Sequence, residues 1–128
     1  MEKEKRNDLT RGEEEVMQLV WRLGEANINE LLDVMPDPKP KYTTVATFIK
    51  LLEEKGFVAR RPNRRGFSYY PLVEKQEYAR RVMSTMLNGY FDGSLVQLVS
   101  FFSNDERVSL GEMEEIAAII SEAKKQKQ

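Results

Sequence analysis

The 128-residue sequence contains no cysteine and no histidine. Without cysteine the chain cannot form a disulfide framework, a thiolate nucleophile or a cysteine metal site. Without histidine it lacks the commonest general base and the commonest zinc ligand. Carboxylates remain, but no motif brings them together as a catalytic pair. We therefore expect neither an enzyme nor a protein that carries a metal or another cofactor.

Long apolar runs are also absent, since none approaches the roughly 18 residues that a membrane-spanning helix requires. The first six residues, MEKEKR, are charged and lead into no apolar segment of the kind that a signal peptide has. The composition, 41% hydrophobic and 32% charged, is typical of a globular protein. We expect a cytoplasmic chain with no membrane insertion, folded as one domain or as one small domain plus an appendage.

The net charge is only −1, but the charges are unevenly distributed along the chain. Residues 1–38 carry a net charge of −5, residues 39–81 carry +7, and residues 82–128 carry −3. A basic segment between acidic flanks is a local electrostatic footprint, which a nucleic-acid-binding surface needs more than a high overall pI.

Helix signals predict three helices in the first half of the chain. Thr10 with Glu13 and Asn27 with Glu30 both match the capping box that opens a helix. The first helix is expected to end at Gly24, and prolines at 36, 38 and 40 end the second. A third helix is expected from about Thr43 to Lys55, followed by a glycine in the left-handed cap position.

The pattern then becomes extended. Residues 57–61 and 67–70 flank the turn-rich segment 62–66, which predicts a β-hairpin. Three further helices are predicted over about 75–89, 94–102 and 110–125, and Ser109 with Glu112 again fits a capping box. The expected fold is mainly α with a small β-hairpin wing. It comprises a winged helix-turn-helix DNA-binding domain over residues 8–73 and a helical dimerisation domain over residues 74–126.

In helix-turn-helix proteins the last helix of the trio enters the major groove, and its N-terminal residues meet the base edges. The candidate recognition residues are Thr43, Thr44, Ala46, Thr47 and Lys50. Threonine can hydrogen bond to a base or touch a thymine methyl, and lysine can reach a guanine or a phosphate. The alternative is a solvated helix face, with Glu54 at its far end, that binds nothing.

Basic residues on either side of this helix favour the DNA-binding interpretation. Phosphates would pass the positive end of the helix dipole, and guanidinium groups clasp phosphates and can enter a minor groove. Tyr42 could instead pack under the recognition helix, and the arginines could form a merely solubilising wing tip. The candidate phosphate contacts are Lys39, Lys41, Tyr42, Arg60, Arg61, Arg64 and Arg65.

The C-terminal segment is strongly amphipathic but too short to form a core alone. Its apolar stripes could pack on the winged domain of the same chain. A two-fold homodimer explains them better, because it also places two recognition helices on one operator. The candidate dimerisation residues are Tyr78, Val82, Met86, Tyr90, Phe91, Leu95, Leu98, Val99, Phe102, Met113, Ile116 and Ile120.

Several separated motifs, in order, give the chain a family resemblance over about residues 8–124. They are Leu9-Thr10 with Glu14-Glu15-Val16-Met17 and Val20-Trp21, then residues 42–47 (YTTVAT), 54–56 (EKG), 69–73 (YYPLV) and 91–95 (FDGSL). Together they resemble the penicillinase-repressor (BlaI/MecI/CopY) family. The resemblance implies an N-terminal winged helix, a C-terminal helical dimerisation domain and repression at dyad-symmetric operators. Related repressors often carry larger basic residues at the positions of Ala46 and Leu51, so the resemblance does not imply an exact operator sequence.

Two inducing mechanisms are associated with that family. Copper-responsive members use C-terminal cysteine motifs, which this chain lacks, so copper sensing is not expected. β-Lactam-responsive members are cut at an Asn–Phe bond in the dimerisation region. The matching position here is Phe101-Phe102, without the asparagine. We hypothesise that a membrane-linked sensor protease is a partner and cuts near Phe101.

The sequence therefore predicts a DNA-binding repressor whose partners are double-stranded operator DNA and a second copy of itself. The alternative is a winged-helix module that uses its wing on an acidic protein partner and has no sequence-specific DNA binding. Only the first predicts salt-steep duplex binding.

Overall fold

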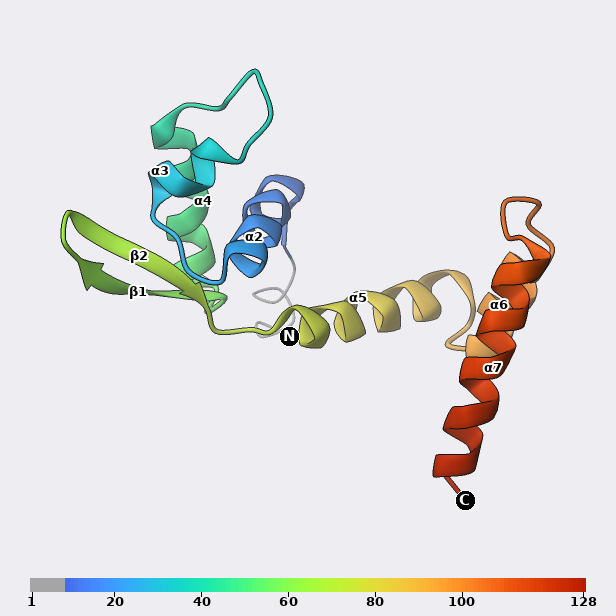
Figure 1. Ribbon diagram of the computed structural model, residues 1–128. Helices are drawn as coiled ribbons and strands as arrows, with labels where there is room; N and C mark the ends of the chain where they lie inside the picture. Colours follow the sequence, from blue (N-terminus) through green and yellow to red (C-terminus); the bar gives the residue numbers. More distant parts are fainter. Residues whose placement is uncertain (1–8) are drawn as a thin grey trace. The chain divides into compact units, whose positions relative to one another are not determined.

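The computed structural model describes residues 9–128, so the predicted domain start at residue 8 lies outside the described residues (Figure 1). The chain divides into two compact units between Ala79 and Arg80, whereas the sequence predicts a division between residues 73 and 74. The N-terminal unit contains α2 (Arg11–Leu23), α3 (Ile28–Asp33), α4 (Tyr42–Glu54), β1 (Val58–Asn63) and β2 (Gly66–Pro71). The division falls inside α5 (Lys75–Tyr90).

The predicted helix starts are confirmed. The Thr10 N–H donates to Glu13 Oε1 at 2.8 Å, and the Glu13 N–H donates back to Thr10 Oγ1 at 3.4 Å. Asn27 and Glu30 exchange the same pair of bonds, both at 2.8 Å. Helix α2 ends at Gly24, whose φ of 83° lies in the left-handed region that favours glycine.

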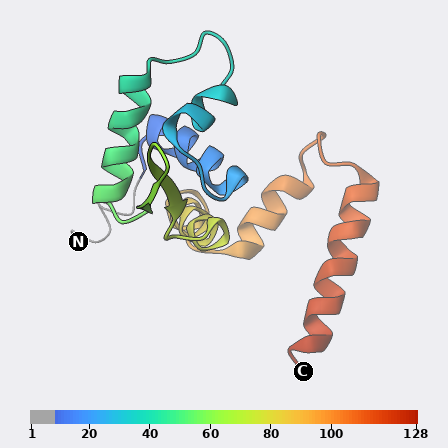
Figure 2. The same ribbon diagram turned by 60° about the vertical axis from the view of Figure 1, so that its left-hand side comes forward.

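The three helices of the N-terminal unit are grouped together in both views (Figures 1 and 2), and Figure 1 shows the hairpin at one edge of the group. Each helix turns an apolar stripe inward because its apolar residues recur every three or four positions. Burying one such large apolar side chain contributes about 1.5–3 kcal/mol. The core consists of Val16, Met17, Val20, Ala26, Ile28, Leu31, Val45, Ile49, Leu52, Phe57, Val58 and Tyr78.

The hairpin is longer than the sequence predicts. Antiparallel pairing runs from Val58 opposite Pro71 to Asn63 opposite Gly66, so only Arg64 and Arg65 lie between the strands. The segment between α2 and α3 also pairs with the hairpin. Ala26 forms an antiparallel bridge to Tyr69 of β2 through two backbone hydrogen bonds of 3.0 and 2.8 Å. This bridge ties the hairpin to the helical core.

Tyr78, predicted as a dimerisation residue, is instead part of the N-terminal core. It is only 8% exposed, and its ring contacts Trp21 and Phe57 at centroid distances of 5.9 and 5.5 Å. The Leu9 N–H also donates to its hydroxyl at 3.3 Å. The prediction failed because the stripe on α5 continues past the boundary between the units, and its first member faces the N-terminal core.

The C-terminal unit contains the rest of α5, together with α6 (Leu95–Ser103) and α7 (Leu110–Gln126). Ser109 and Glu112 form the predicted capping box. Within the described chain no residue of α6 or α7 is buried. The rings of Phe91 and Phe101 meet edge-on at 5.5 Å. The apolar residues of this unit therefore have no core of their own to fill.

The Asp105 carboxylate lies in the connection between α6 and α7. The Arg107 side chain and backbone both donate to it, and these bonds hold the pKa of Asp105 below its usual value.

Across residues 9–128 no helix has both the length and the apolar character that crossing a bilayer demands. The predicted class, mainly α with a β-hairpin wing, is confirmed.

Candidate nucleic-acid interface

Helix α4 presents one polar face and one buried face. Val45, Ile49 and Leu52 are buried, since they recur at helical spacing toward α2 and α3. The predicted recognition residues Thr43, Thr44, Thr47 and Lys50 are all exposed. Ala46 is only half-buried and packs against the edge of the core, so it lies at the margin of the polar face rather than within it.

The polar face differs in hydrogen-bonding capacity along its length. The Thr47 hydroxyl donates to the Thr43 carbonyl at 2.9 Å, one helical turn back. Its proton is therefore already used, and what remains available is an oxygen lone pair and the methyl group. Within the described residues the Lys50 ammonium makes no hydrogen bond or ion pair, so its charge is available to a partner.

The N-terminus of α4 has no side-chain cap. Lys41 occupies the cap position and makes no side-chain hydrogen bond to the helix, unlike Thr10 before α2. Helix N-termini attract anions through their free N–H groups and the helix dipole. Lys41 is exposed and Tyr42 is 50% exposed, so both side chains are accessible beside this end of the helix.

Lys39, predicted as a phosphate contact, has a structural role instead. Its ammonium donates to the carbonyls of Leu32, Asp33 and Met35 at 2.7, 3.3 and 2.6 Å. These carbonyls belong to the last turn of α3 and the residues just after it, where the helix leaves carbonyls without partners and its dipole favours a cation. Lys39 therefore caps α3 and supports the loop that leads to α4.

Each of the two arginines on β1 is held by a carboxylate and an aromatic ring. Arg60 Nε lies 3.6 Å from Glu53 Oε2, and its guanidinium stacks over Phe67 at 4.4 Å from the ring centroid. Arg61 Nε lies 3.3 Å from Glu25 Oε2 and stacks over the Tyr70 ring, also at 4.4 Å. Cation–π contacts of this kind stabilise by about 0.5–1 kcal/mol at exposed sites.

Arg64 and Arg65 at the wing tip differ from the pair on β1. Both are exposed, and within residues 9–128 neither guanidinium group makes an ion pair or hydrogen bond. Within the turn the Arg65 backbone N–H donates to Asn63 Oδ1 at 3.2 Å. The full positive charge of the tip is therefore available to an anionic partner.

Glu25 joins the wing to the helical core. Its Oε2 accepts a hydrogen bond from the buried Ser68 hydroxyl and also pairs with Arg61. The neighbouring residue, Ala26, makes the backbone bridge to Tyr69. Burial, with the nearby negative charge of Glu53, raises the pKa of Tyr69, so this phenol stays neutral beside Arg60.

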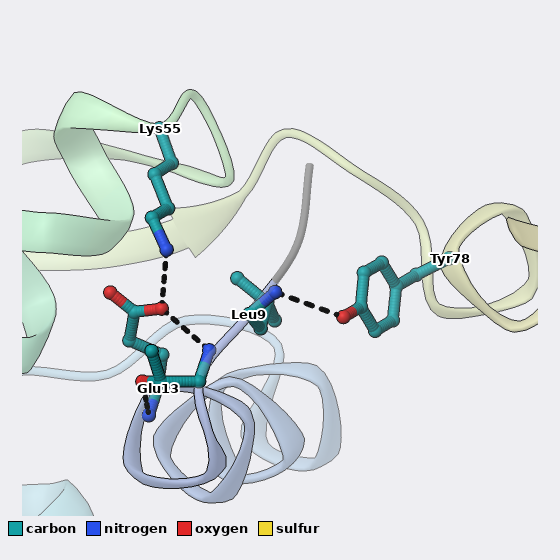
Figure 3. A network of polar contacts seen from close by, with 5 residues as sticks. Leu9, Glu13, Lys55 and Tyr78 are labelled. Carbon is teal, nitrogen blue, oxygen red and sulfur yellow. Dashed lines mark hydrogen bonds and ion pairs between the residues drawn. The ribbon is translucent and has the colours of Figure 1, made fainter. Parts of the chain in front are cut away.

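A second carboxylate fixes α4 against α2 (Figure 3). Glu13 is 2% exposed, and its Oε1 accepts from Lys55 Nζ at 2.6 Å as well as from the Thr10 N–H. Burial opposes its ionisation, but the bonds from Lys55 and Thr10 outweigh burial and lower the pKa of Glu13 below its usual value. Glu13 is therefore charged at neutral pH and ties the end of α4 to the start of α2.

Comparison with known proteins matches residues 9–122 to the family described as penicillinase repressor. The chain belongs to the penicillinase repressor family. It is 30% identical over 117 residues to the methicillin resistance regulatory protein MecI of Staphylococcus aureus strain N315, covering 89% of this chain and 94% of MecI. It is 28% identical over 116 residues to the penicillinase repressor of Bacillus licheniformis, covering 88% and 89%.

Membership of the penicillinase repressor family makes the chain a DNA-binding transcriptional repressor and confirms the predictions of family and of a non-enzymatic role. It is also 35% identical over 95 residues to an uncharacterised 16.5 kDa protein of Latilactobacillus sakei, covering 70% and 64%.

Two features of the interface were missed at the sequence level. Glu25 and Glu53 hold the arginines of β1, but Glu25 lies 36 positions before Arg61, and no local pattern joins them. Lys55 was expected only as a helix end, although it meets the carboxylate of a capping box 42 positions earlier. A long-range pairing of this kind becomes visible only when the helices pack.

Proposed function

We propose that this repressor binds a dyad-symmetric operator as a homodimer, with α4 in the major groove and the wing tip on the neighbouring phosphates. The supporting observation is the division of its basic residues into two classes. Lys39, Arg60 and Arg61 are engaged within the fold, whereas Lys50, Arg64 and Arg65 have no partner within the described residues. The second class lies on the polar face of α4 and at the wing tip.

The residues of α4 take different roles in this proposal. Thr43 and Thr44, in the first turn, donate to base edges or phosphates, and Lys50 reaches a guanine edge or the backbone. Thr47 contributes its methyl group, because its hydroxyl proton is directed at Thr43. Lys41 and Tyr42 contact the phosphate that meets the uncapped end of the helix.

The homodimer is proposed from the apolar surface that the C-terminal unit leaves uncovered. Tyr90 is 82% exposed, and Val82, Leu95 and Ile120 are also exposed. Solitary exposed apolar residues need no explanation, but a stripe along three successive helices is typical of an interface. A two-fold partner would cover it and hold two α4 helices about 34 Å apart, one turn of DNA.

A pair of variants on α7 tests the dimer. Ile116 lies in the predicted stripe, and Ala118 lies on the opposite face of the helix. We expect the Ile116→Asp variant to be a monomer in sedimentation equilibrium, because a dimer would have to bury the unpaired carboxylate of the new aspartate. Ala118→Asp adds the same charge and should leave the dimer intact. A dimer that tolerates both variants would contradict this interface.

Selection from a randomised duplex pool at two salt concentrations tests operator binding, with the mass of the protein measured in the same buffer. The proposal predicts enrichment of a dyad-symmetric site by a dimer and an affinity that falls steeply with salt. Without enrichment and with a shallow salt response, operator recognition by α4 would be wrong, and acidic protein partners would be tested instead.

Relief of repression is proposed to follow proteolysis between Phe101 and Phe102. Phe101 is 64% exposed, and α6, with nine residues and none buried, is short enough to unwind into the extended form that proteases bind. Co-expression with a cognate membrane-linked sensor protease under inducing conditions should give a fragment of residues 1–101 by intact mass. A catalytically inactive protease is the control, and an uncut chain with the active protease would refute the proposal.

A further inference from the structure

A groove with a volume of about 490 Å³ lies in the N-terminal unit, away from the polar face of α4. Its lining residues come from α2, from the loop between α3 and α4, and from α4. Its volume lies within the range of about 300–1,000 Å³ that small-molecule sites have. Its apolar walls include Val16, Leu19, Phe48, Pro36, Pro38 and Pro40.

The shape of this groove depends on the absence of a side chain at Gly12. A Cβ atom there would lie 2.4 Å from Cζ of Phe48, which is far too close for a real contact. The Phe48 ring therefore packs on the bare backbone of α2 and forms one flat wall. The three prolines supply further rigid surfaces to the lining.

The lining is poor in hydrogen-bond donors and carries a negative charge. Proline has no backbone N–H, so the three prolines of the loop offer carbonyl acceptors and ring faces but no donors. Lys39 belongs to the same loop, but its ammonium is engaged by the carbonyls at the end of α3. Among the described residues, Glu15 is the charged residue of the lining, and the lining also includes the amide of Gln18.

Glu15 is accessible to a cationic ligand. Arg11 Nε lies 3.4 Å from its Oε1, but the two side chains are 96% and 70% exposed. A pair this exposed stabilises by only about 0–1 kcal/mol, so a ligand cation can compete with Arg11 for the carboxylate.

We propose that this groove binds a small organic cation in which one or two apolar rings carry a protonated amine. The rings lie between the prolines and Phe48, and the amine pairs with Glu15. The groove has this volume, lining and charge whether or not the chain binds the proposed operator.

Two probes with the same ring system and opposite charge test the proposal, namely 2-naphthylmethylammonium and 2-naphthoate. Titration is followed by the ¹H–¹⁵N shifts of the Gly12 and Gln18 backbone amides, so that binding elsewhere, such as on α6 or α7, is not counted. We expect the cation to shift both amides in a saturable way and the anion to bind more weakly.

Three variants sharpen the test. Glu15→Gln should weaken binding of the cation about two- to fivefold, and Arg11→Ala should strengthen it by a similar factor, because Arg11 no longer competes. Glu14→Gln removes a neighbouring carboxylate that is not part of the lining and should change nothing. No shift at Gly12 and Gln18 with either probe would overturn the site. Equal binding of the two probes, or no effect of Glu15→Gln, would overturn the assignment to a cation.

Discussion

Replacing Glu13 by glutamine should destabilise the N-terminal unit far more than an ordinary surface substitution. The Glu13 carboxylate is almost fully buried and accepts bonds from Lys55 and from the Thr10 N–H. Glutamine keeps the size and the bond to Thr10 but removes the charge opposite Lys55. Breaking a buried ion pair on one side costs about 3–5 kcal/mol. Because the Lys55 side chain is 22% exposed, we expect about 2–3 kcal/mol of lost unfolding free energy.

The pH dependence gives an independent check on this magnitude. The pKa of folded Glu13 is lowered from its usual 4.5, so its contribution is fully present above about pH 4.5. The contribution is lost as the pH falls through the lower pKa of the folded state. The wild-type chain should therefore lose this part of its stability below about pH 4.5, and the Glu13→Gln variant should not.

Urea unfolding followed by the fluorescence of Trp21 is the appropriate assay. Trp21 is the single tryptophan, and its Nε1–H donates to the Val73 carbonyl at 2.8 Å, so it reports on the N-terminal unit. Glu15→Gln is the matched control, because its exposed pair with Arg11 should contribute less than about 1 kcal/mol. If Glu13→Gln were no more destabilising than Glu15→Gln, the reasoning about the buried pair would be refuted.

Three further substitutions test the packing and the wing. Gly12→Ala should destabilise the N-terminal unit by about 1–2 kcal/mol in the same assay, because the new methyl group meets the Phe48 ring at 2.4 Å. Lys39→Ala should lower the unfolding free energy by about 0.5–1.5 kcal/mol, because the end of α3 loses its cap. The same variant should leave unchanged the slope of log K against log salt for duplex binding (the salt slope). Glu25→Gln should speed amide exchange in β2 about five- to tenfold by hydrogen-exchange mass spectrometry, since the carboxylate that pairs with Arg61 is lost.

Each of these substitutions has a control and a contradicting result. Gly111→Ala, whose Cβ would meet nothing closer than 3.8 Å, lies in the C-terminal unit and should leave the Trp21 transition unchanged, and equal effects at both glycines would contradict the Phe48 contact. Lys50→Ala should reduce the salt slope by about one, whereas a reduced slope for Lys39→Ala would restore its phosphate role. Unchanged exchange after Glu25→Gln would mean that the Ala26–Tyr69 bridge alone holds the wing.

Local signals in the sequence predicted the helices and the wing well. Capping boxes such as that of Thr10 and Glu13 involve side chains three positions apart, so they can be recognised before the chain folds. The hairpin was predicted too short, because pairing extends to Asn63 and Gly66 once the turn tightens around the two arginines. Propensity alone does not indicate where a ladder of backbone hydrogen bonds ends.

The roles of individual charged residues were harder to predict, because they depend on packing. Lys39 and Arg64 are equally basic in sequence, but only the structure shows that Lys39 faces the end of α3 while Arg64 projects from the wing tip. The groove beside Gly12 was likewise invisible, since its walls come from three separate segments. The prediction of Tyr78 as a dimerisation residue failed for the same reason, because α5 contributes residues to both units.

The most direct test of the central claim is the salt dependence of binding to the selected duplex, measured by fluorescence anisotropy for the wild type and for the Arg64→Ala/Arg65→Ala double variant. If α4 and the wing tip bind operator DNA as proposed, each lost phosphate contact reduces the slope of log K against log salt by about 0.9. The double variant should then show a slope shallower by about 1.8 per chain. An unchanged slope would contradict the account of the wing tip as a phosphate-binding element.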